Sequence, residues 1–176
     1  MRNRTDLSHD SHTESSIYHD TWRLLKKYRD ITWSLEMSVR QAQGNDRVEY
    51  VRIEDFLHTV YQTGVYSTDH DLWRHARNIE RSYKMLRLIE TAIELLRTKH
   101  KSGESLYWVL YFTFMTPQKL QNTEEIIEKL RPHVRDISIP TYYRKRQEAI
   151  SVLSSILWGY TSRDCLDILD QLVPSQ

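Results

Sequence analysis

The chain has 176 residues, of which 39% are hydrophobic and 11% aromatic, with only 4 Gly and 4 Pro. This composition excludes a chain that is disordered throughout and predicts one or two packed cores. Lys and Arg number 25 against 24 Asp and Glu, a formal net charge of +1, which excludes a uniformly basic nucleic-acid coat and a uniformly acidic tail. Recognition of a charged partner must therefore come from a local patch.

The apolar segments are too short to cross a membrane. The longest, Leu106 to Met115, is well below the roughly 20 residues that a spanning helix needs. The N-terminal residues contain no apolar block of the kind that a secretory signal has. The single cysteine, Cys165, cannot form an internal disulfide, which fits a reducing compartment. We therefore expect a cytoplasmic protein with no membrane partner.

The first part of the chain is expected to consist of a polar tail and a long helix. Residues 1–16 are rich in Ser, His and Asp and show no periodicity, which is typical of a disordered tail. His9 and His12 lie three residues apart, but the tail supplies no third ligand, so we expect no metal site there. From Tyr18 to Val39 apolar residues recur at spacings of three and four, which predicts a long amphipathic helix.

Two further helices are predicted before a boundary near Gly103. The first is short, from about Ile53 to Gln62, and the second is long, from Asp69 to about Lys99, with a near-heptad apolar pattern. The helices of residues 17–102 are thus expected to pack as a hairpin, or as a seam against a second copy of the chain. In either case this region would dimerise the protein or dock a partner.

Residues 103–176 differ in both pattern and charge. Prolines and Gly159 cut this part into short helices. The stretch from Tyr107 to Met115 has a high β propensity, but no second strand is available to pair with it, so a buried helix is predicted. Bases outnumber acids by 14 to 11 from Arg81 onward, whereas acids outnumber bases by 13 to 11 before it.

Two helices joined by a turn are predicted in this basic part. Thr123 supplies a capping hydroxyl for the first helix, which Arg131-Pro132 ends. Ser138 caps the second helix, and Pro140 is tolerated in its first turn. The core face of the second helix is predicted to consist of Tyr143, Ile150, Leu153 and Leu157. The opposite side is predicted to present Thr141, Arg144, Lys145 and Glu148, with Tyr142 and Arg146 at the boundary.

The basic residues of this segment predict a nucleic-acid interface. Six bases stand against one acid between Lys129 and Gln147. A second helix that presents Thr, Arg and Lys from its first turns is what a major-groove reader requires. The plainer interpretation is the solvated face of a packed helix, but the two caps and the aromatic pair favour nucleic acid. The predicted DNA-binding residues are Thr141, Tyr142, Arg144, Lys145, Arg146, Arg135, Arg131 and Lys129.

The same segment resembles known regulators. Residues 124–130 followed by residues 138–145 resemble the helix-turn-helix of sigma factor region 4. The Thr-Tyr-Tyr-Arg-Lys element with the following Glu-Ala-Ile is most similar to the ArpU and RinA families of phage and mobile-element transcriptional regulators. The similarity covers roughly Glu104 to Tyr160. The fold class that follows is all-α, with a long N-terminal helical hairpin and a small helix-turn-helix domain over residues 103–176.

The resemblance also implies partners and residue roles. It implies sequence-specific binding of double-stranded DNA near a promoter, and contact with RNA polymerase. Tyr143 would pack inward, and the recognition positions would be those of Thr141, Tyr142, Arg144 and Lys145. One departure is the connector of residues 131–137, which is longer than such motifs usually have. It either changes the angle between the helices or serves as an extra phosphate-contacting loop.

A last helix is expected after the corner at Gly159. Thr161 to Asp164 fit a capping box, and an apolar face that includes Cys165 follows. Aspartates recur at every third position of this helix, but they lack His or Glu companions, so an acidic solvated face is expected rather than a metal site.

Catalysis is not expected. The chain has no glycine-rich phosphate loop, no paired Cys or His ligands and no serine in an elbow, so we expect neither an enzyme nor a cofactor. The leading hypothesis is a DNA-binding transcriptional regulator. The alternative is a module of helix-turn-helix shape that binds RNA polymerase or another protein, for example as an inhibitor of a host factor. The near-neutral charge and the 5 Trp and 11 Tyr, which suit interface hot spots, favour this alternative.

Overall fold

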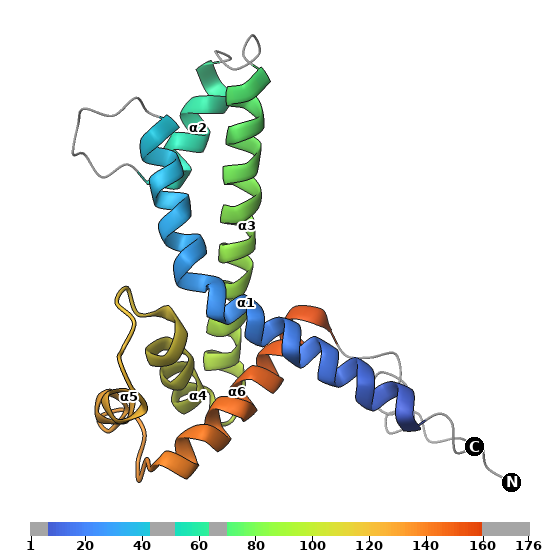
Figure 1. Ribbon diagram of the computed structural model, residues 1–176, viewed down its shortest axis with the longest axis vertical. Coiled ribbons are helices and arrows are strands. Elements are labelled where there is room, and N and C mark those ends of the chain that lie inside the picture. Colours follow the sequence, from blue (N-terminus) through green and yellow to red (C-terminus); the bar gives the residue numbers. More distant parts are fainter. Residues whose placement is uncertain (1–6, 43–51, 64–69, 160–176) are drawn as a thin grey trace, which may run out of the picture. The chain divides into compact units, whose positions relative to one another are not determined.

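A computed structural model describes residues 7–42, 52–63 and 70–159. These parts of the chain are helical and contain no strand (Figure 1), which confirms the all-α class. The helices are α1 (Leu7–Ala42), α2 (Ile53–Thr63), α3 (His70–Lys99), α4 (Gly103–Leu110), the π-helical turn η2 (Tyr111–Met115), α5 (Thr123–Leu130) and α6 (Ile139–Trp158). The predicted helix after Gly159 lies outside the described residues, as do residues 1–6.

The chain divides into two compact units. One comprises Met1–Lys26 with Ala92–Gln176, and the other comprises Lys27–Thr91. Both long helices therefore contribute to each unit. The division differs from the boundary expected near Gly103, because the last turns of α3 group with the residues that follow them.

The N-terminal helix begins earlier than the sequence predicts. Residues 1–16 are expected to form a disordered tail, whereas α1 begins at Leu7, so the prediction is wrong from that residue onward. Extending an existing helix adds one hydrogen bond for each residue that is fixed. A polar stretch can therefore continue a helix that apolar residues further along have nucleated.

The unit of Lys27–Thr91 packs parts of three helices together. Its buried side chains include Leu35, Val39, Phe56, Leu57, Ala76, Ile79, Leu86 and Ile89. The Tyr28 hydroxyl of α1 donates a hydrogen bond of 2.8 Å to Glu90 of α3, and Tyr83 of α3 donates one to Glu54 of α2. Removal from water and the bond to Glu54 raise the pKa of Tyr83 to about 12. This phenol is therefore protonated at neutral pH and acts as a donor between α2 and α3.

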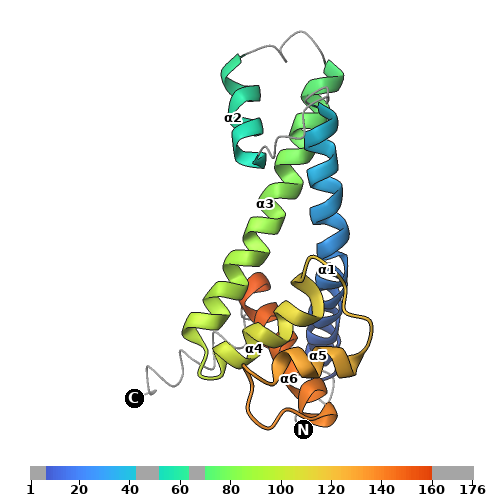
Figure 2. The same ribbon diagram turned by 90° about the vertical axis from the view of Figure 1, so that its left-hand side faces the viewer.

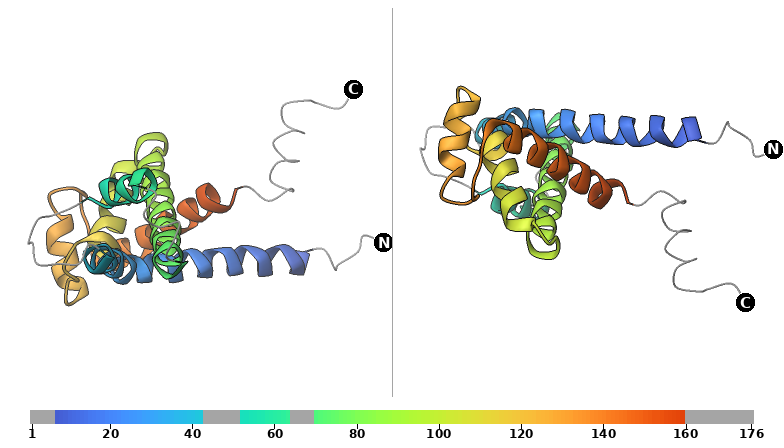
Figure 3. Two further views of the ribbon diagram at one scale, coloured as in Figure 1. Left: turned by 90° about the horizontal axis from the view of Figure 1, so that it is seen from above. Right: turned by 90° about the horizontal axis from the view of Figure 1, so that it is seen from below.

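In the other unit, α4, α5 and α6 enclose a separate core. Val109 of α4, Ile127 and Leu130 of α5, Val134 of the following turn and Tyr142 of α6 meet there. Figure 2 and Figure 3 show α5 beside α4 and the first turns of α6. Because each helix contributes an apolar side chain to one cluster, the positions of α5 and α6 depend on each other.

The aromatic stretch after Gly103 is helical, as predicted. α4 passes directly into η2, so the alternative of a buried strand is excluded. Within η2 the Thr113 hydroxyl lies 3.2 Å from the Tyr142 hydroxyl. The π-helical turn therefore places a polar partner beside the one hydroxyl in the buried cluster.

The capping residues agree with the sequence at α6 and differ at α5. Ser138 caps α6 and accepts from the Thr141 N–H, with Pro140 in the first turn, as predicted. At α5 the cap is Asn122, whose Oδ1 accepts from the Glu125 N–H at 2.8 Å. The prediction of Thr123 as the cap is therefore wrong by one residue, because an Asn carbonyl caps a helix as well as a hydroxyl does.

Gly103 allows α4 to begin against the end of α3. A Cβ at this buried position would meet the backbone carbonyl oxygens of Leu96, at 2.5 Å, and of Arg97. We predict that Gly103→Ala lowers the free energy of unfolding by about 1–3 kcal/mol, because backbone atoms must shift. Chemical denaturation measures this loss. Lys101→Ala, at an exposed neighbour, is the control and should change stability by less than about 0.5 kcal/mol; equal losses in both variants would contradict the close contact.

Candidate nucleic-acid interface

The rotation of α6 about its axis decides which side chains face outward. Tyr142 is 1% exposed and Tyr143 is 43% exposed. The prediction that Tyr143 packs inward is therefore wrong, and Tyr142, which is predicted at the boundary of the exposed side and at a recognition position, is buried instead. Ala149 is fully buried with Ile150 and Leu153, and it lies seven residues after Tyr142, which is the same face of a helix. Because Ala149 belongs to the buried face, the centre of that face lies closer to Tyr142 than the larger apolar residues alone indicate.

The outward side of α6 is an exposed stripe. Its members are spaced by three and four residues, so they share one face, and each is exposed: Pro140, Tyr143, Arg144, Gln147 and Ser151. We call these five residues the outward stripe. Gln147 is not among the predicted site residues, although the helical spacing from Arg144 could have found it. The stripe combines a guanidinium, a carboxamide and an aromatic ring.

Four of the predicted cations are exposed and available for binding. Lys129 and Arg131 lie at the end of α5, Arg135 lies in the turn, and Arg144 lies in the outward stripe. No hydrogen bond or ion pair joins their side chains to other residues in the described part of the chain. By contrast, Arg52 pairs with Asp55 and Arg87 pairs with Glu90 in the other unit.

Two predicted site residues are engaged inside the protein. The Thr141 hydroxyl lies 2.9 Å from the Ser138 hydroxyl at the cap of α6. The half-buried Lys145 Nζ donates a hydrogen bond of 3.1 Å to Ser105 Oγ on α4. Both residues thus hold α6 in place, and neither points freely outward.

Arg146 and the two tyrosines form a stacked group. The guanidinium of Arg146 lies 4.8 Å from the ring centre of Tyr143 and 5.6 Å from that of Tyr142. The Tyr143 hydroxyl lies 3.4 Å from Thr123 Oγ1 at the start of α5. The exposed side chain of Tyr143 therefore contacts a cation of its own helix through its ring and a hydroxyl of α5 through its own hydroxyl.

The turn between α5 and α6 is anchored at two points. Val134 is 4% exposed and packs into the cluster around Tyr142. His133 stacks on Trp108 of α4, with ring centres 3.8 Å apart. Asp136 adopts a φ of 50°, a left-handed conformation that Asp tolerates better than most residues do. The turn of residues 131–138 is thus packed against α4, and Arg131 and Arg135 project from a supported segment.

Trp108 is itself held by an ion pair between the end of α3 and the start of α4. Its Nε1 donates to Glu104 Oε1 at 2.8 Å, and Arg97 Nε donates to Glu104 Oε2 at 2.7 Å. The hydrogen bonds from Arg97 and then from Trp108 hold the pKa of Glu104 below its usual value of 4.5. A charged Glu104 therefore connects α3 to the ring that supports the turn.

The lowered pKa of Glu104 predicts a pH dependence of stability. A carboxyl group whose pKa is lowered by folding contributes stability that is present above its unfolded pKa and is lost as the pH falls through its folded pKa. The stability of the natural chain should therefore exceed that of Glu104→Gln by a constant amount above about pH 6, and the difference should shrink below pH 4.5. Thermal unfolding at several pH values measures it. A difference that does not change with pH would contradict this role for the carboxylate.

The two tyrosines provide a test of the rotation of α6. Tyr142→Ala should lower the free energy of unfolding by about 3–5 kcal/mol, because it leaves a cavity in a packed core. Tyr143→Ala, at the exposed neighbour, should cost less than about 1 kcal/mol. Urea denaturation compares the two, and a greater loss for Tyr143→Ala would favour the orientation predicted from the sequence.

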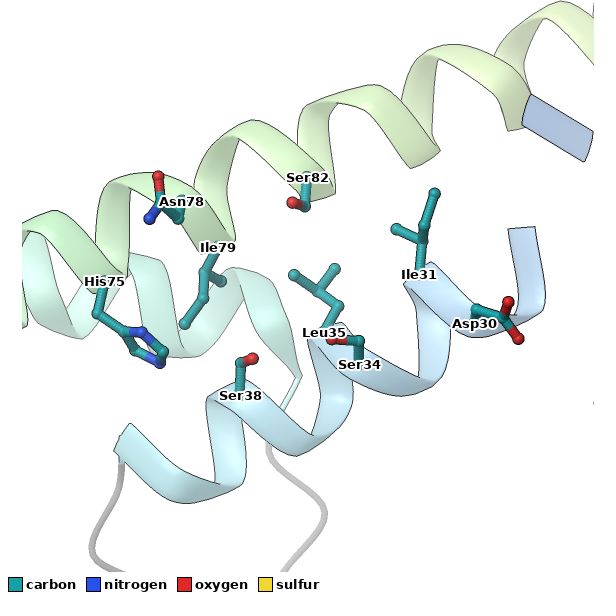
Figure 4. Close-up of a pocket in the computed structure, with 9 residues that line it drawn as sticks. All are labelled: Asp30, Ile31, Ser34, Leu35, Ser38, His75, Asn78, Ile79 and Ser82. Carbon is teal, nitrogen blue, oxygen red and sulfur yellow. The ribbon is translucent and has the colours of Figure 1, made fainter. Parts of the chain in front are cut away.

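A second candidate site is a groove between α1 and α3 in the unit of Lys27–Thr91 (Figure 4). It has a volume of about 270 Å³. Its lining residues are Asp30, Ile31, Ser34, Leu35, Ser38, His75, Asn78, Ile79 and Ser82. Ser34 and Ser38 lie on the α1 side, and Asn78 and Ser82 lie on the α3 side. The lining offers three hydroxyls, one carboxamide, one carboxylate and one imidazole for hydrogen bonding, without a concentration of one charge.

Comparisons with protein-family models, with curated proteins and with solved structures gave no match. No helix within the described ranges is long and apolar enough to cross a membrane. Among the same residues, no group of three or more His, Cys, Asp and Glu side chains is placed to hold a metal ion.

Proposed function

We propose that the protein is a sequence-specific DNA-binding regulator in which α5, the following turn and α6 act as a helix-turn-helix. The observation that carries this proposal is Arg144, in the centre of the outward stripe, which is exposed and has no partner among the described residues. α6 presents this stripe from its first turns, which are the turns that enter the major groove in such motifs. The buried Tyr142 fixes the rotation of the helix and so supports the stripe.

The exposed polar residues divide into two roles. A guanidinium such as that of Arg144 reads guanine through two hydrogen bonds, and a carboxamide such as that of Gln147 reads adenine. Lys129, Arg131 and Arg135 lie at the end of α5 and in the turn, where they would contact phosphates and set the register of the protein on the duplex. This assignment makes the connector of residues 131–137 the phosphate-contacting loop.

Only part of the predicted site belongs to the proposed interface. Tyr142 supports the interface from the core, and Lys145 and Thr141 hold α6 through contacts within the protein. The resemblance to sigma region 4 and to phage regulators is a further reason for the DNA proposal. Three further points stay predictions: RNA polymerase as a second partner, a phage or mobile-element origin, and a cytoplasmic location.

The first experiment is binding of the full chain to genome fragments over a range of salt concentrations. We expect specific fragments to be retained at about 100 mM salt, with an affinity that falls steeply as salt rises. Arg144→Ala should weaken specific binding by about 1–3 kcal/mol, because it removes a bidentate base contact. Lys145→Ala should have a smaller effect, since its amine already binds Ser105.

Arg81→Ala is the matched control for this experiment, because Arg81 is an exposed arginine on α3 outside the proposed interface. It should leave both the affinity and the salt dependence unchanged. The DNA proposal fails if no fragment is retained at about 100 mM salt, or if Arg81→Ala and Arg144→Ala weaken binding equally.

The alternative function, a protein-binding module, is favoured by exposed apolar side chains of the other unit. Trp33 is 66% exposed and Met37, one turn later on α1, is 40% exposed. On α3, Met85 and Leu88 are 45% and 58% exposed. Exposed Trp and Met are typical of interface hot spots and adaptable docking surfaces. Light scattering of the full chain distinguishes a homodimer, which these side chains would join, from a monomer, in which they would be left to another protein.

A further inference from the structure

We infer that Tyr143, with Ile139, contacts the methyl group of a thymine in the DNA site, so that the recognised sequence contains a thymine beside the base read by Arg144. This inference rests on the proposed DNA-binding function. Two apolar side chains are exposed at the start of α6: Ile139 is 46% exposed and Tyr143 is 43% exposed. They lie four residues apart and therefore on the same side of the helix.

Neither exposed side chain is needed for the core. The cluster that joins α4, α5 and α6 is built from Tyr142 and its apolar neighbours, while Ile139 and Tyr143 lie outside it. Two contacts nevertheless restrict the orientation of Tyr143: the Arg146 guanidinium lies 4.8 Å from its ring, and Thr123 Oγ1 lies 3.4 Å from its hydroxyl. A side chain that is ordered before binding loses less conformational entropy on contact. Its restricted orientation therefore suits a contact surface.

The neighbours of this apolar pair indicate the kind of partner. Arg144 and Gln147 lie beside it in the outward stripe, and both residue types hydrogen-bond to base edges in the major groove. The apolar group that base pairs present in that groove is the C5-methyl of thymine. A protein partner would instead favour a larger apolar centre from which charge is depleted. An apolar pair that adjoins a guanidinium and a carboxamide thus fits thymine next to guanine or adenine.

The test removes only the methyl group. Duplexes that bind the full chain are selected from a randomised library, and each thymine of the best duplex is then replaced by uracil, one at a time. Uracil keeps every hydrogen-bonding group of thymine and lacks the methyl. Binding is measured by fluorescence anisotropy at constant salt. We expect a loss of about fourfold at one or two positions, which corresponds to about 0.8 kcal/mol for one buried apolar carbon.

Three variants assign the effect to its residues. Tyr143→Ala or Ile139→Ala should bind more weakly and should no longer distinguish thymine from uracil at the sensitive position. Arg144→Ala should also bind more weakly but should retain that distinction, because its contact is with another base. Comparing the thymine and uracil duplexes in each variant separates the loss of the methyl contact from a general loss of affinity.

The outcomes separate this inference from the function on which it rests. If no duplex is selected, the proposed DNA binding fails, and the inference fails with it. If a duplex is selected and no thymine position responds to uracil, DNA binding stands and the methyl contact is refuted. A response that both Tyr143→Ala and Ile139→Ala retain would also refute it, because the methyl would then contact another part of the protein.

Discussion

The burial of Tyr142 is the constraint on which the proposed interface depends. Its ring fills the cluster formed with Val109, Ile127, Leu130 and Val134, so one side chain of α6 joins α4, α5 and the turn. A helix pinned by a large side chain cannot rotate without opening a cavity. The side chains opposite Tyr142 are therefore directed outward by the same contact that closes the core.

This constraint explains which parts of the fold could be predicted from the sequence. Caps and prolines act locally, so Ser138 and Pro140 mark the start of α6 correctly, and Gly159 marks its end. The rotation of α6 about its axis depends instead on how side-chain volumes pack in the core. Tyr142 and Tyr143 are the same residue type at adjacent positions, so their own hydrophobicity does not decide which of them is buried. Only one of them can face the core, and the small Ala149, rather than a larger residue, decides which. A pattern that counts only large apolar residues overlooks this contribution.

The candidate site was predictable to a similar extent and for similar reasons. Charge counting finds the basic segment, and it includes Lys145 and Arg146 because they are adjacent to Arg144 in sequence. In the structure these two cations contact Ser105 and the tyrosine rings, because successive residues of a helix point about 100° apart. Gln147 is uncharged, so counting charges does not find it, although it lies on the same face of α6 as Arg144. The composition therefore locates the basic segment, and the helix geometry determines which of its residues lie on the exposed face.

The surroundings of the turn give the proposed interface its rigidity. The connector between α5 and α6 is long for a motif of this kind, and a long loop would leave Arg131 and Arg135 poorly placed for phosphates. Here the stack of His133 on Trp108 and the buried Val134 tie the loop to α4. Trp108 is in turn bound to Glu104, which pairs with Arg97. The extra residues of the connector therefore carry their own packing contacts, and in the proposed interface their cations would meet a phosphate backbone without first ordering the loop that bears them.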